Sequence, residues 1–277
     1  MTPNETAVQF ECGNELLIGI HHGTQSDRKI GVLIIVGGPQ YRTGSHRQFT
    51  LLARHLAQQG IPAFRFDNRG MGDSTGAARD FENIAEDIRC ALDAFGKASP
   101  NIQEFVLWGL CDAATACAIY AHHDRRVTGL VLANPWVRND RTHAQAHLKH
   151  YFPQRIMQPA FWKKLFSGKL NLVQAGTSFL QQHRLARSTQ SESCPALAER
   201  MLGGLQQFQG RVLIILSGND LTAQEFAEAT RSNAAWRQLF DHPAFSSHQL
   251  AQADHTFSCR AWRDQVAEWT VEWIKLN

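Results

Sequence analysis

The sequence lacks the long runs by which a chain binds a membrane or a nucleic acid. No apolar run among the 277 residues reaches the roughly 20 that a spanning helix needs, so no integral membrane segment is predicted. The 28 basic and 25 acidic residues are scattered and leave a net charge of only +3, which argues against nucleic acid as a partner. The opening residues, MTPNE, indicate neither a secretory signal nor a lipid anchor.

Cysteines are few, and their spacing is not that of a paired framework. The six lie at positions 12, 90, 111, 117, 194 and 259, without a CxxC motif. This spacing argues against structural disulfides and a thiolate zinc site, and it favours a reduced, cytoplasmic setting. His143, His147 and His150 share helical spacing, but few plausible ligands accompany them. We interpret them as a solvated or substrate-facing helix edge and expect neither a metal nor another cofactor.

The chain has enough apolar residues for one large core. Its hydrophobic content of 43% favours a single domain spanning residues 1–277. Short β-rich runs alternate with longer amphipathic stretches, a rhythm typical of a mainly parallel α/β sheet with helices on both faces. The turn dipeptide Gly13-Asn14 predicts an antiparallel hairpin within residues 7–22. Between residues 138 and 209 the pattern becomes irregular, and we expect a helical lid or cap there.

The remaining elements follow from apolar runs and periodicity. Strands are predicted at residues 31–36, 61–67, 105–110, 127–133, 211–216 and 246–252, and helices at 47–59, 81–97, 112–121, 223–240 and 260–276. The predicted lid contains the aromatic residues Tyr151, Phe152, Phe161, Trp162 and Phe166. They are equally consistent with an apolar substrate wall and with helix packing inside the lid.

A nucleophile elbow is predicted where a buried strand runs directly into a helix. The segment Trp108-Gly109-Leu110-Cys111-Asp112-Ala113 has this strand–turn–helix context, with cysteine in place of the usual serine. A thiol at a helix N-terminus beside an imidazole is an able nucleophile. Cys111 could instead be a small buried core residue, as free cysteines often are. That second interpretation suits Cys117, two turns later on an apolar helix.

Partners for this nucleophile occur in the chain order of an α/β-hydrolase triad. Asp220 follows the strand at 211–216, and His255 follows the last strand. Asp220 would orient the imidazole of His255, which would take up the thiol proton and later protonate the leaving group. Asp220 could alternatively serve as a turn residue or helix N-cap. His242 and His248 compete with His255 but precede or lie within the last predicted strand.

An oxyanion hole is expected between the elbow and the loop after the strand at 31–36. The backbone N–H of Asp112 is one predicted donor, and Gly38 is the other, with Gln40 as a second candidate in that loop. Pro39 has no N–H to donate. The two glycines of this loop could instead only turn the chain. Residues 67–74 (DNRGMGDS) contain glycines but no phosphate-binding lysine, so we interpret them as a structural loop that supports the active-site edge.

Four segments together resemble a known family. Residues 37–42 (GGPQYR), 67–74 (DNRGMGDS), 109–113 (GLCDA) and 217–220 (SGND) are similar to the exosortase A system-associated hydrolases of the first type, and the similarity spans most of the chain. The resemblance implies a bacterial α/β-hydrolase encoded with exopolysaccharide synthesis genes and a protein-sorting system. It implies no substrate, because this fold hosts esterases, thioesterases, peptidases and acyltransferases.

Three functions remain open from the sequence. The first is hydrolysis of a small-molecule ester or thioester through an acyl-Cys111 intermediate. The second is acyl transfer by the same residues to a saccharide or carrier acceptor. The third is a non-catalytic binding module, which the retention of competent residues at all three triad positions disfavours. Composition and motifs give no oligomeric state.

Overall fold

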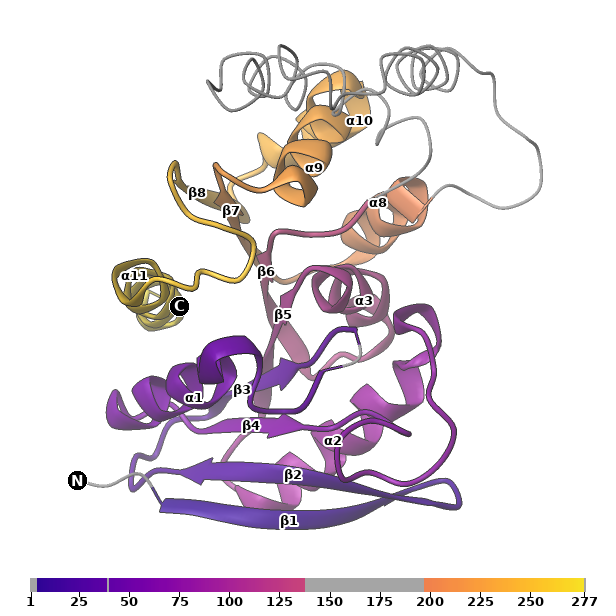
Figure 1. The fold of residues 1–277 in the computed structure, drawn as a ribbon, viewed down its shortest axis with the longest axis vertical. Helices are drawn as coiled ribbons and strands as arrows, with labels where there is room; N and C mark the ends of the chain where they lie inside the picture. Colours follow the sequence, from indigo (N-terminus) through magenta and orange to yellow (C-terminus); the bar gives the residue numbers. More distant parts are fainter. Residues whose placement is uncertain (1–3, 39, 138–196, 277) are drawn as a thin grey trace, which may run out of the picture.

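A computed structural model describes residues 4–38, 40–137 and 197–276, which form a mainly parallel sheet with helices on both faces (Figure 1). The strand order is β1-β2-β4-β3-β5-β6-β7-β8, and all pairings after β2–β4 are parallel in the described residues. The strands are β1 (Asn4–Cys12), β2 (Glu15–Gly23), β3 (Ile30–Ile35), β4 (Ala63–Phe66), β5 (Glu104–Leu110), β6 (Val127–Ala133), β7 (Arg211–Ser217) and β8 (Phe245–Leu250). The fold class predicted from sequence rhythm is confirmed.

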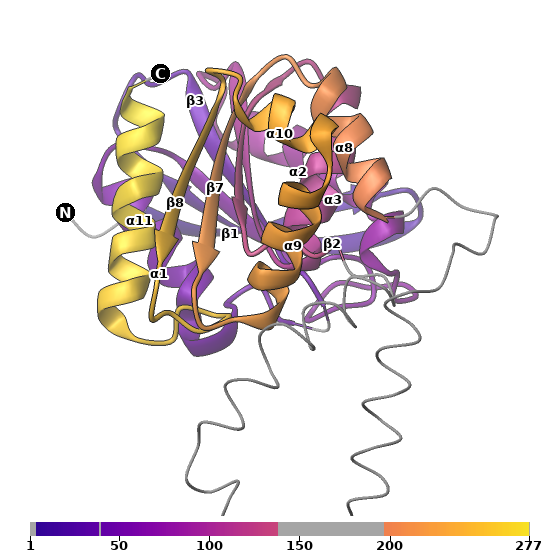
Figure 2. The same cartoon turned by 90° about the horizontal axis from the view of Figure 1, so that it is seen from above.

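Helices cover the two faces unequally (Figure 2). One face carries α1 (Gln48–Gln58) and α11 (Arg260–Lys275), and the other carries α2 (Ala85–Ala98), α3 (Asp112–Tyr120), α8 (Leu197–Gln207), α9 (Leu221–Ser232) and α10 (Ala234–Phe240). Alternate strand residues face opposite ways, so Leu33 and Ile35 join the second core while Val32 and Ile34 join the first. Short 3₁₀ turns lie at Ser45–Arg47, Phe81–Asn83 and Ala121–His123.

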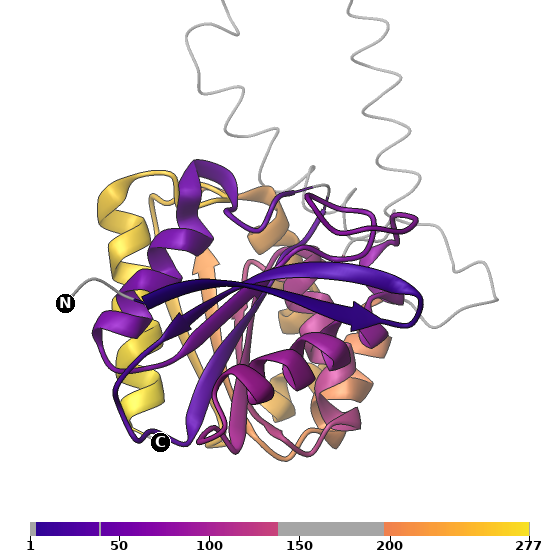
Figure 3. The ribbon, with the colours of Figure 1, turned by 90° about the horizontal axis from the view of Figure 1, so that it is seen from below.

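The predicted N-terminal hairpin is present and forms one edge of the sheet (Figure 3). β1 and β2 pair from Asn4 with Gly23 to Cys12 with Glu15, and Gly13 turns the chain with φ +62°. This backbone conformation is one that glycine adopts without a Cβ penalty. The turn dipeptide therefore fixed the register of the whole hairpin.

The predicted helix at residues 223–240 is divided into two helices in the structure. Residues 223–240 were expected to form a single helix, but the chain forms α9 and α10 with a break at Asn233. Asn233 is extended (φ −114°, ψ 127°), and its side-chain oxygen accepts a 2.9 Å hydrogen bond from the Ala235 N–H. Asparagine competes with a continuing helix in this way and caps the next one.

The predicted lid falls largely outside the described residues, which exclude 138–196. Its last part contains α8, which packs against α3 on the sheet and contributes Met201 and Leu205 to the core. None of the helices in the described ranges is long and apolar enough to cross a membrane.

Two adjacent glycines test the contact between α8 and α3. A Cβ at Gly204 would lie 2.4 Å from the Ala118 carbonyl oxygen, whereas a Cβ at Gly203 would meet nothing within 4 Å. We expect Gly204→Ala to lower the free energy of unfolding by about 1–3 kcal/mol through overpacking. The control Gly203→Ala should raise it by about 0.5–1 kcal/mol through helix propensity. Urea unfolding measures both; equal effects would contradict the close contact.

Candidate active site

Cys111 occupies a strained turn between β5 and α3. Its backbone has φ +62° and ψ −125°, a region that non-glycine residues rarely adopt. The Cys111 N–H donates to the Ala133 carbonyl at 2.9 Å, which ties the turn to the end of β6. A Cβ at Gly109 would lie 2.6 Å from the Ala113 carbonyl carbon, so only glycine lets α3 start this close to β5. Cys111 is partly exposed at the carboxyl edge of the sheet.

Asp220 has two sets of partners at the end of β7. Its carboxylate accepts hydrogen bonds from the N–H groups of Thr222 at 3.3 Å and Ala223 at 3.1 Å, which caps α9. Oδ2 of the same carboxylate lies 2.9 Å from Nδ1 of His255. The N-cap interpretation and the triad interpretation therefore describe one side chain that makes both contacts.

His255 lies between an acid and a thiol. Hydrogen bonding with the Asp220 carboxylate, and then with the Cys111 sulfur, raises the pKa of His255 to about 10. Partial burial opposes this effect, because desolvation disfavours the charged imidazolium. The structure thus brings Asp220, His255 and Cys111 together in one contact series at the carboxyl ends of β5, β7 and β8. At neutral pH this imidazole carries a positive charge beside the sulfur.

Asn134 holds the His255 loop, and the sequence analysis missed it. Its side-chain nitrogen donates to the His255 carbonyl at 2.9 Å and to Ser217 Oγ at 2.9 Å, while its oxygen accepts from the Ser217 N–H at 2.8 Å. Ser217 Oγ in turn donates to the Asp254 carbonyl at 2.8 Å. The available signal was an asparagine directly after the predicted strand at 127–133, at the edge where parallel strands place functional groups.

The predicted oxyanion donors have other partners in this structure. Gly38 N–H donates to Asp112 Oδ2 at 2.8 Å, and Gln40 N–H donates to the Gly38 carbonyl at 2.8 Å. Gln40 is therefore directed back into its own turn. The carboxylate of Asp112 also accepts from the Ala113 N–H at 2.9 Å. Gly38 and Asp112 lie together as expected, but a side chain fills the space between their N–H groups.

An arginine–aspartate cluster fixes the loop that contains Gly38. Asp67, fully buried at the end of β4, accepts from the Arg42 backbone N–H at 2.6 Å and pairs with the Arg42 guanidinium. Asp73 accepts from Arg42 Nη1 at 2.8 Å and from Tyr41 Oη at 2.6 Å. Asn68 Nδ2 donates to the Val36 carbonyl at 2.7 Å. These contacts support our interpretation of residues 67–74 as a loop that braces the active-site edge.

The two aspartates of this cluster should differ strongly in their effect on stability. Asp67→Asn removes the buried carboxylate and leaves the nearly buried Arg42 guanidinium only the exposed Asp73 as a charged partner, so we expect a loss of about 1.5–3 kcal/mol in the free energy of unfolding. Asp73, with 56% of its side chain exposed, serves as the control, and Asp73→Asn should cost at most about 1 kcal/mol. Chemical denaturation followed by circular dichroism compares them; similar losses would refute the buried pair as the main brace.

The other cysteine and histidine candidates from the sequence lie away from the group of Cys111, His255 and Asp220 or outside the described residues. Cys117 is fully buried on α3, and burial raises the pKa of its thiol. His248, on β8, stacks on Trp269 with ring centroids 4.4 Å apart. His242 Nδ1 accepts from the Ala244 N–H at 3.2 Å in the turn before β8. The predicted helix edge with His143, His147 and His150 lies outside the described residues.

One group of potential metal ligands occurs among the described residues, namely Cys12, Glu86 and Asp87. The guanidinium of Arg69 already lies among them, with Nη2 at 2.9 Å from the Cys12 sulfur, 2.9 Å from Glu86 and 3.0 Å from Asp87. A permanently charged side chain supplies the positive charge that a metal would bring. The group is explained as an internal ion-pair cluster.

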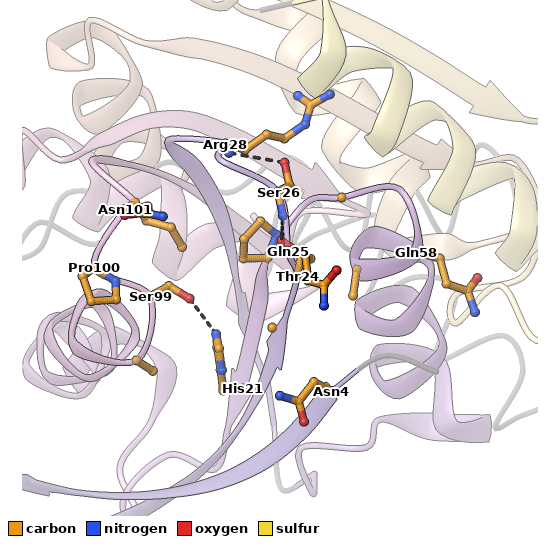
Figure 4. Close-up of a pocket in the computed structure, with 16 residues that line it drawn as sticks. Asn4, His21, Thr24, Gln25, Ser26, Arg28, Gln58, Ser99, Pro100 and Asn101 are labelled. Atoms are coloured by element: carbon orange, nitrogen blue, oxygen red, sulfur yellow. Dashed lines mark hydrogen bonds between the residues drawn. The ribbon is translucent and has the colours of Figure 1, made fainter. Parts of the chain in front are cut away.

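A pocket of about 890 Å³ opens at the opposite end of the sheet (Figure 4). Its lining includes Arg28, Pro62 and Ile102, which precede β3, β4 and β5, whereas Cys111 follows the end of β5. His21 and Ser99 face each other in it, with Nε2 and Oγ 2.7 Å apart. This pocket is therefore separate from the candidate active site.

Solved structures with the same fold are enzymes of several kinds. An esterase from Pyrococcus furiosus aligns with a TM-score of 0.67 at 14% identity, over 99% of this chain and 91% of the esterase. A dienelactone hydrolase from Anabaena variabilis has a TM-score of 0.62 at 16% identity, over 99% and 98%. A proline iminopeptidase from Mycobacterium smegmatis has a TM-score of 0.61 at 14% identity, over 98% and 99%. No curated protein sequence matches significantly.

The low sequence identities to these structures show only a common fold. A family model shows the family. The model described as serine aminopeptidase, S33, matches residues 29–225, which is more than half of the chain and includes both the elbow and Asp220. The matched segment also carries the Gly38 loop and the Asp67 brace. The α/β-hydrolase fold expected from the elbow and from the order of the partners is thereby confirmed. The chain belongs to the serine aminopeptidase S33 family of α/β-hydrolases.

Proposed function

We propose that this enzyme cleaves a small-molecule ester or thioester through a covalent acyl-cysteine intermediate on Cys111. The observation that carries the proposal is the contact series in which Asp220 lies 2.9 Å from His255 and the His255 imidazole interacts with the Cys111 sulfur. A strained elbow, an imidazole beside its sulfur and a carboxylate behind the imidazole are the parts of a nucleophilic triad. Cysteine stands where the family's name implies serine.

The chemistry follows from the protonation states. His255 holds the proton of the pair as an imidazolium, so the Cys111 sulfur attacks the acyl carbon as a thiolate and forms a C–S bond. The bond to the leaving alkoxide or thiolate then breaks, and the His255 imidazolium protonates that group. In the second half, water gives a proton to His255 while its oxygen attacks the thioester, which releases the acid and restores the thiol. Asp220 stabilises the imidazolium throughout.

A cysteine nucleophile leaves a second outcome open. A thiolate is a better leaving group than an alkoxide, so the acyl-cysteine stays reactive toward amines and hydroxyl groups as well as water. Acyl transfer to a saccharide or carrier would use the same three residues. Products formed from an activated thioester, with and without a sugar acceptor, distinguish the outcomes by mass spectrometry. Acid alone supports hydrolysis, acylated sugar supports transfer, and neither product from an ester or thioester panel would support a binding module.

The biological setting belongs to the same proposal. The similarity of four segments to exosortase A system-associated hydrolases supports a role in bacteria that make exopolysaccharide, and the spacing of the cysteines supports a cytoplasmic setting. We further propose that residues 138–209 contribute a lid over the catalytic edge, with α8 as its last helix against the sheet. Deleting the gene in its host and quantifying exopolysaccharide and its acyl content would test the setting; an unchanged polymer would contradict it.

A further inference from the structure

The carboxylate of Asp112 is bound by backbone N–H groups from the loop after β3 and from the first turn of α3. Oδ2 accepts from Gly38 at 2.8 Å, and Oδ1 accepts from Ala113 at 2.9 Å. The backbone N–H of Asp112 itself also hydrogen bonds to the carboxylate. These donors surround the first turn of α3, where the helix dipole favours negative charge. The side chain of the residue after the elbow therefore occupies an anion site.

This position depends on the glycines of the loop after β3. A Cβ at Gly37 would lie 1.9 Å from Asp112 Oδ1, so any other residue there would collide with the carboxylate. Gly38 has φ +57°, and this conformation aims its N–H at Oδ2. The Asp112 side chain is nearly buried, with 8% of the residue exposed. Loop and side chain thus fit each other closely.

The same donors are needed for catalysis by the proposed mechanism. A tetrahedral oxyanion would take its hydrogen bonds from the N–H groups of Gly38 and Asp112. A carboxylate already bound there both uses these donors and repels a second negative charge. In the observed arrangement, the Gly38 N–H is already used by the Asp112 carboxylate.

We propose that the Asp112 carboxylate is an internal occupant of the oxyanion hole, which a substrate must displace before Cys111 can be acylated. The inference rests on the proposed acyl-cysteine function. Displacement draws on binding energy from parts of the substrate remote from the acyl carbon, so Asp112 determines specificity against small esters that lack such parts. Burial raises the pKa of Asp112, and the hydrogen bonds from the backbone N–H groups of Gly38 and Ala113 oppose this effect.

The test compares Asp112→Ala and Asp112→Asn with the parent enzyme. Alanine removes the occupant and keeps the backbone donor, while asparagine keeps the shape and removes the charge. All three carry Cys259→Ala, because Cys259 is an exposed thiol. Acylation of Cys111 by 4-nitrophenyl acetate is followed by intact mass and peptide mapping. Alkylation by iodoacetamide, which needs no oxyanion hole, is measured in parallel, and thermal melts establish that each variant is folded.

If Asp112 occupies the hole, Asp112→Ala accelerates acylation by roughly 10- to 100-fold, the value of one charge-assisted hydrogen bond, and alkylation changes far less. The acylation rate of Asp112→Asn should lie between those of the parent and Asp112→Ala. Unchanged or slower acylation in Asp112→Ala, at unchanged alkylation, would overturn the inference. If no variant is acylated although Cys111 is alkylated, the proposed function fails. In that case the NMR chemical shift of the Gly38 amide proton tests whether the Asp112 carboxylate occupies the oxyanion hole. An upfield shift in Asp112→Ala supports occupancy, and an unchanged shift overturns it.

Discussion

Cys111→Ala should reduce turnover of an activated thioester by about 10⁴-fold or more, because the nucleophile is lost while the elbow backbone is retained. The acyl adduct should disappear from the intact-mass spectrum at the same time. Alanine is smaller than cysteine and the site is partly exposed, so the free energy of unfolding should change little. Steady-state kinetics, mass spectrometry and a thermal melt measure the three quantities on the same preparation.

A matched control separates the elbow cysteine from ordinary thiol reactivity. Cys259 is an exposed free thiol before α11, so it reacts with electrophiles without any help from a triad. Cys259→Ala should keep full turnover and the adduct on Cys111. If the adduct instead persists in Cys111→Ala and is lost in Cys259→Ala, the proposed nucleophile is wrong.

Cys111→Ser tests why this elbow carries cysteine. A serine hydroxyl must give its proton to a neutral imidazole, whereas the pKa of His255, raised to about 10, keeps the imidazole charged at neutral pH. We expect about a 10²- to 10⁴-fold loss at pH 7, the usual value of general-base catalysis. Removing the sulfur also removes one cause of the raised His255 pKa, which NMR of the imidazole would report as a downward shift. Parent-like turnover would contradict a charged imidazole.

Asp220→Asn should lower turnover by about 10²- to 10⁴-fold, because asparagine neither stabilises the imidazolium nor holds the same tautomer. Asparagine remains a good N-cap, so α9 should stay capped. Asp220→Ala should show the same kinetic loss and a further loss of about 1 kcal/mol in the free energy of unfolding, since the bonds to Thr222 and Ala223 disappear. Equal stability of the two variants would argue against the capping contact.

The pH dependence of this pair has a defined sign. In the folded state the pKa of His255 lies at about 10, above its ordinary value of 6.5. Its stabilising contact with Asp220 is therefore fully present below pH 6.5 and is lost as the pH rises toward 10. The melting temperature of the parent should exceed that of Asp220→Asn most at pH 6 and least above pH 10. As the pH rises, activity that depends on the imidazolium should be lost at a lower pH in Asp220→Asn than in the parent. Coincident pH–activity profiles of the two enzymes would contradict the coupling between Asp220 and His255.

The amino-acid sequence by itself determined the elements that depend on neighbours in the chain. Apolar runs and periodicity located the buried strands and most helices, and the turn dipeptide at Gly13 located the hairpin. The elbow at Cys111 was also a local feature, because a buried strand running into a helix leaves only one place for the turn. Asp220 and His255 could be proposed because their order after the last strands is a rule of this fold.

Only the tertiary structure decided which donors and braces meet at the site. The use of Gly38 N–H by the Asp112 carboxylate, the contacts of Asn134 with the His255 loop, and the pairing of Arg42 with Asp67 all join residues distant in the chain. Hydrogen bonds of this kind depend on the directions of individual side chains, which periodicity does not encode. The break at Asn233 has a related cause: a side-chain cap outweighed a continuous helical pattern.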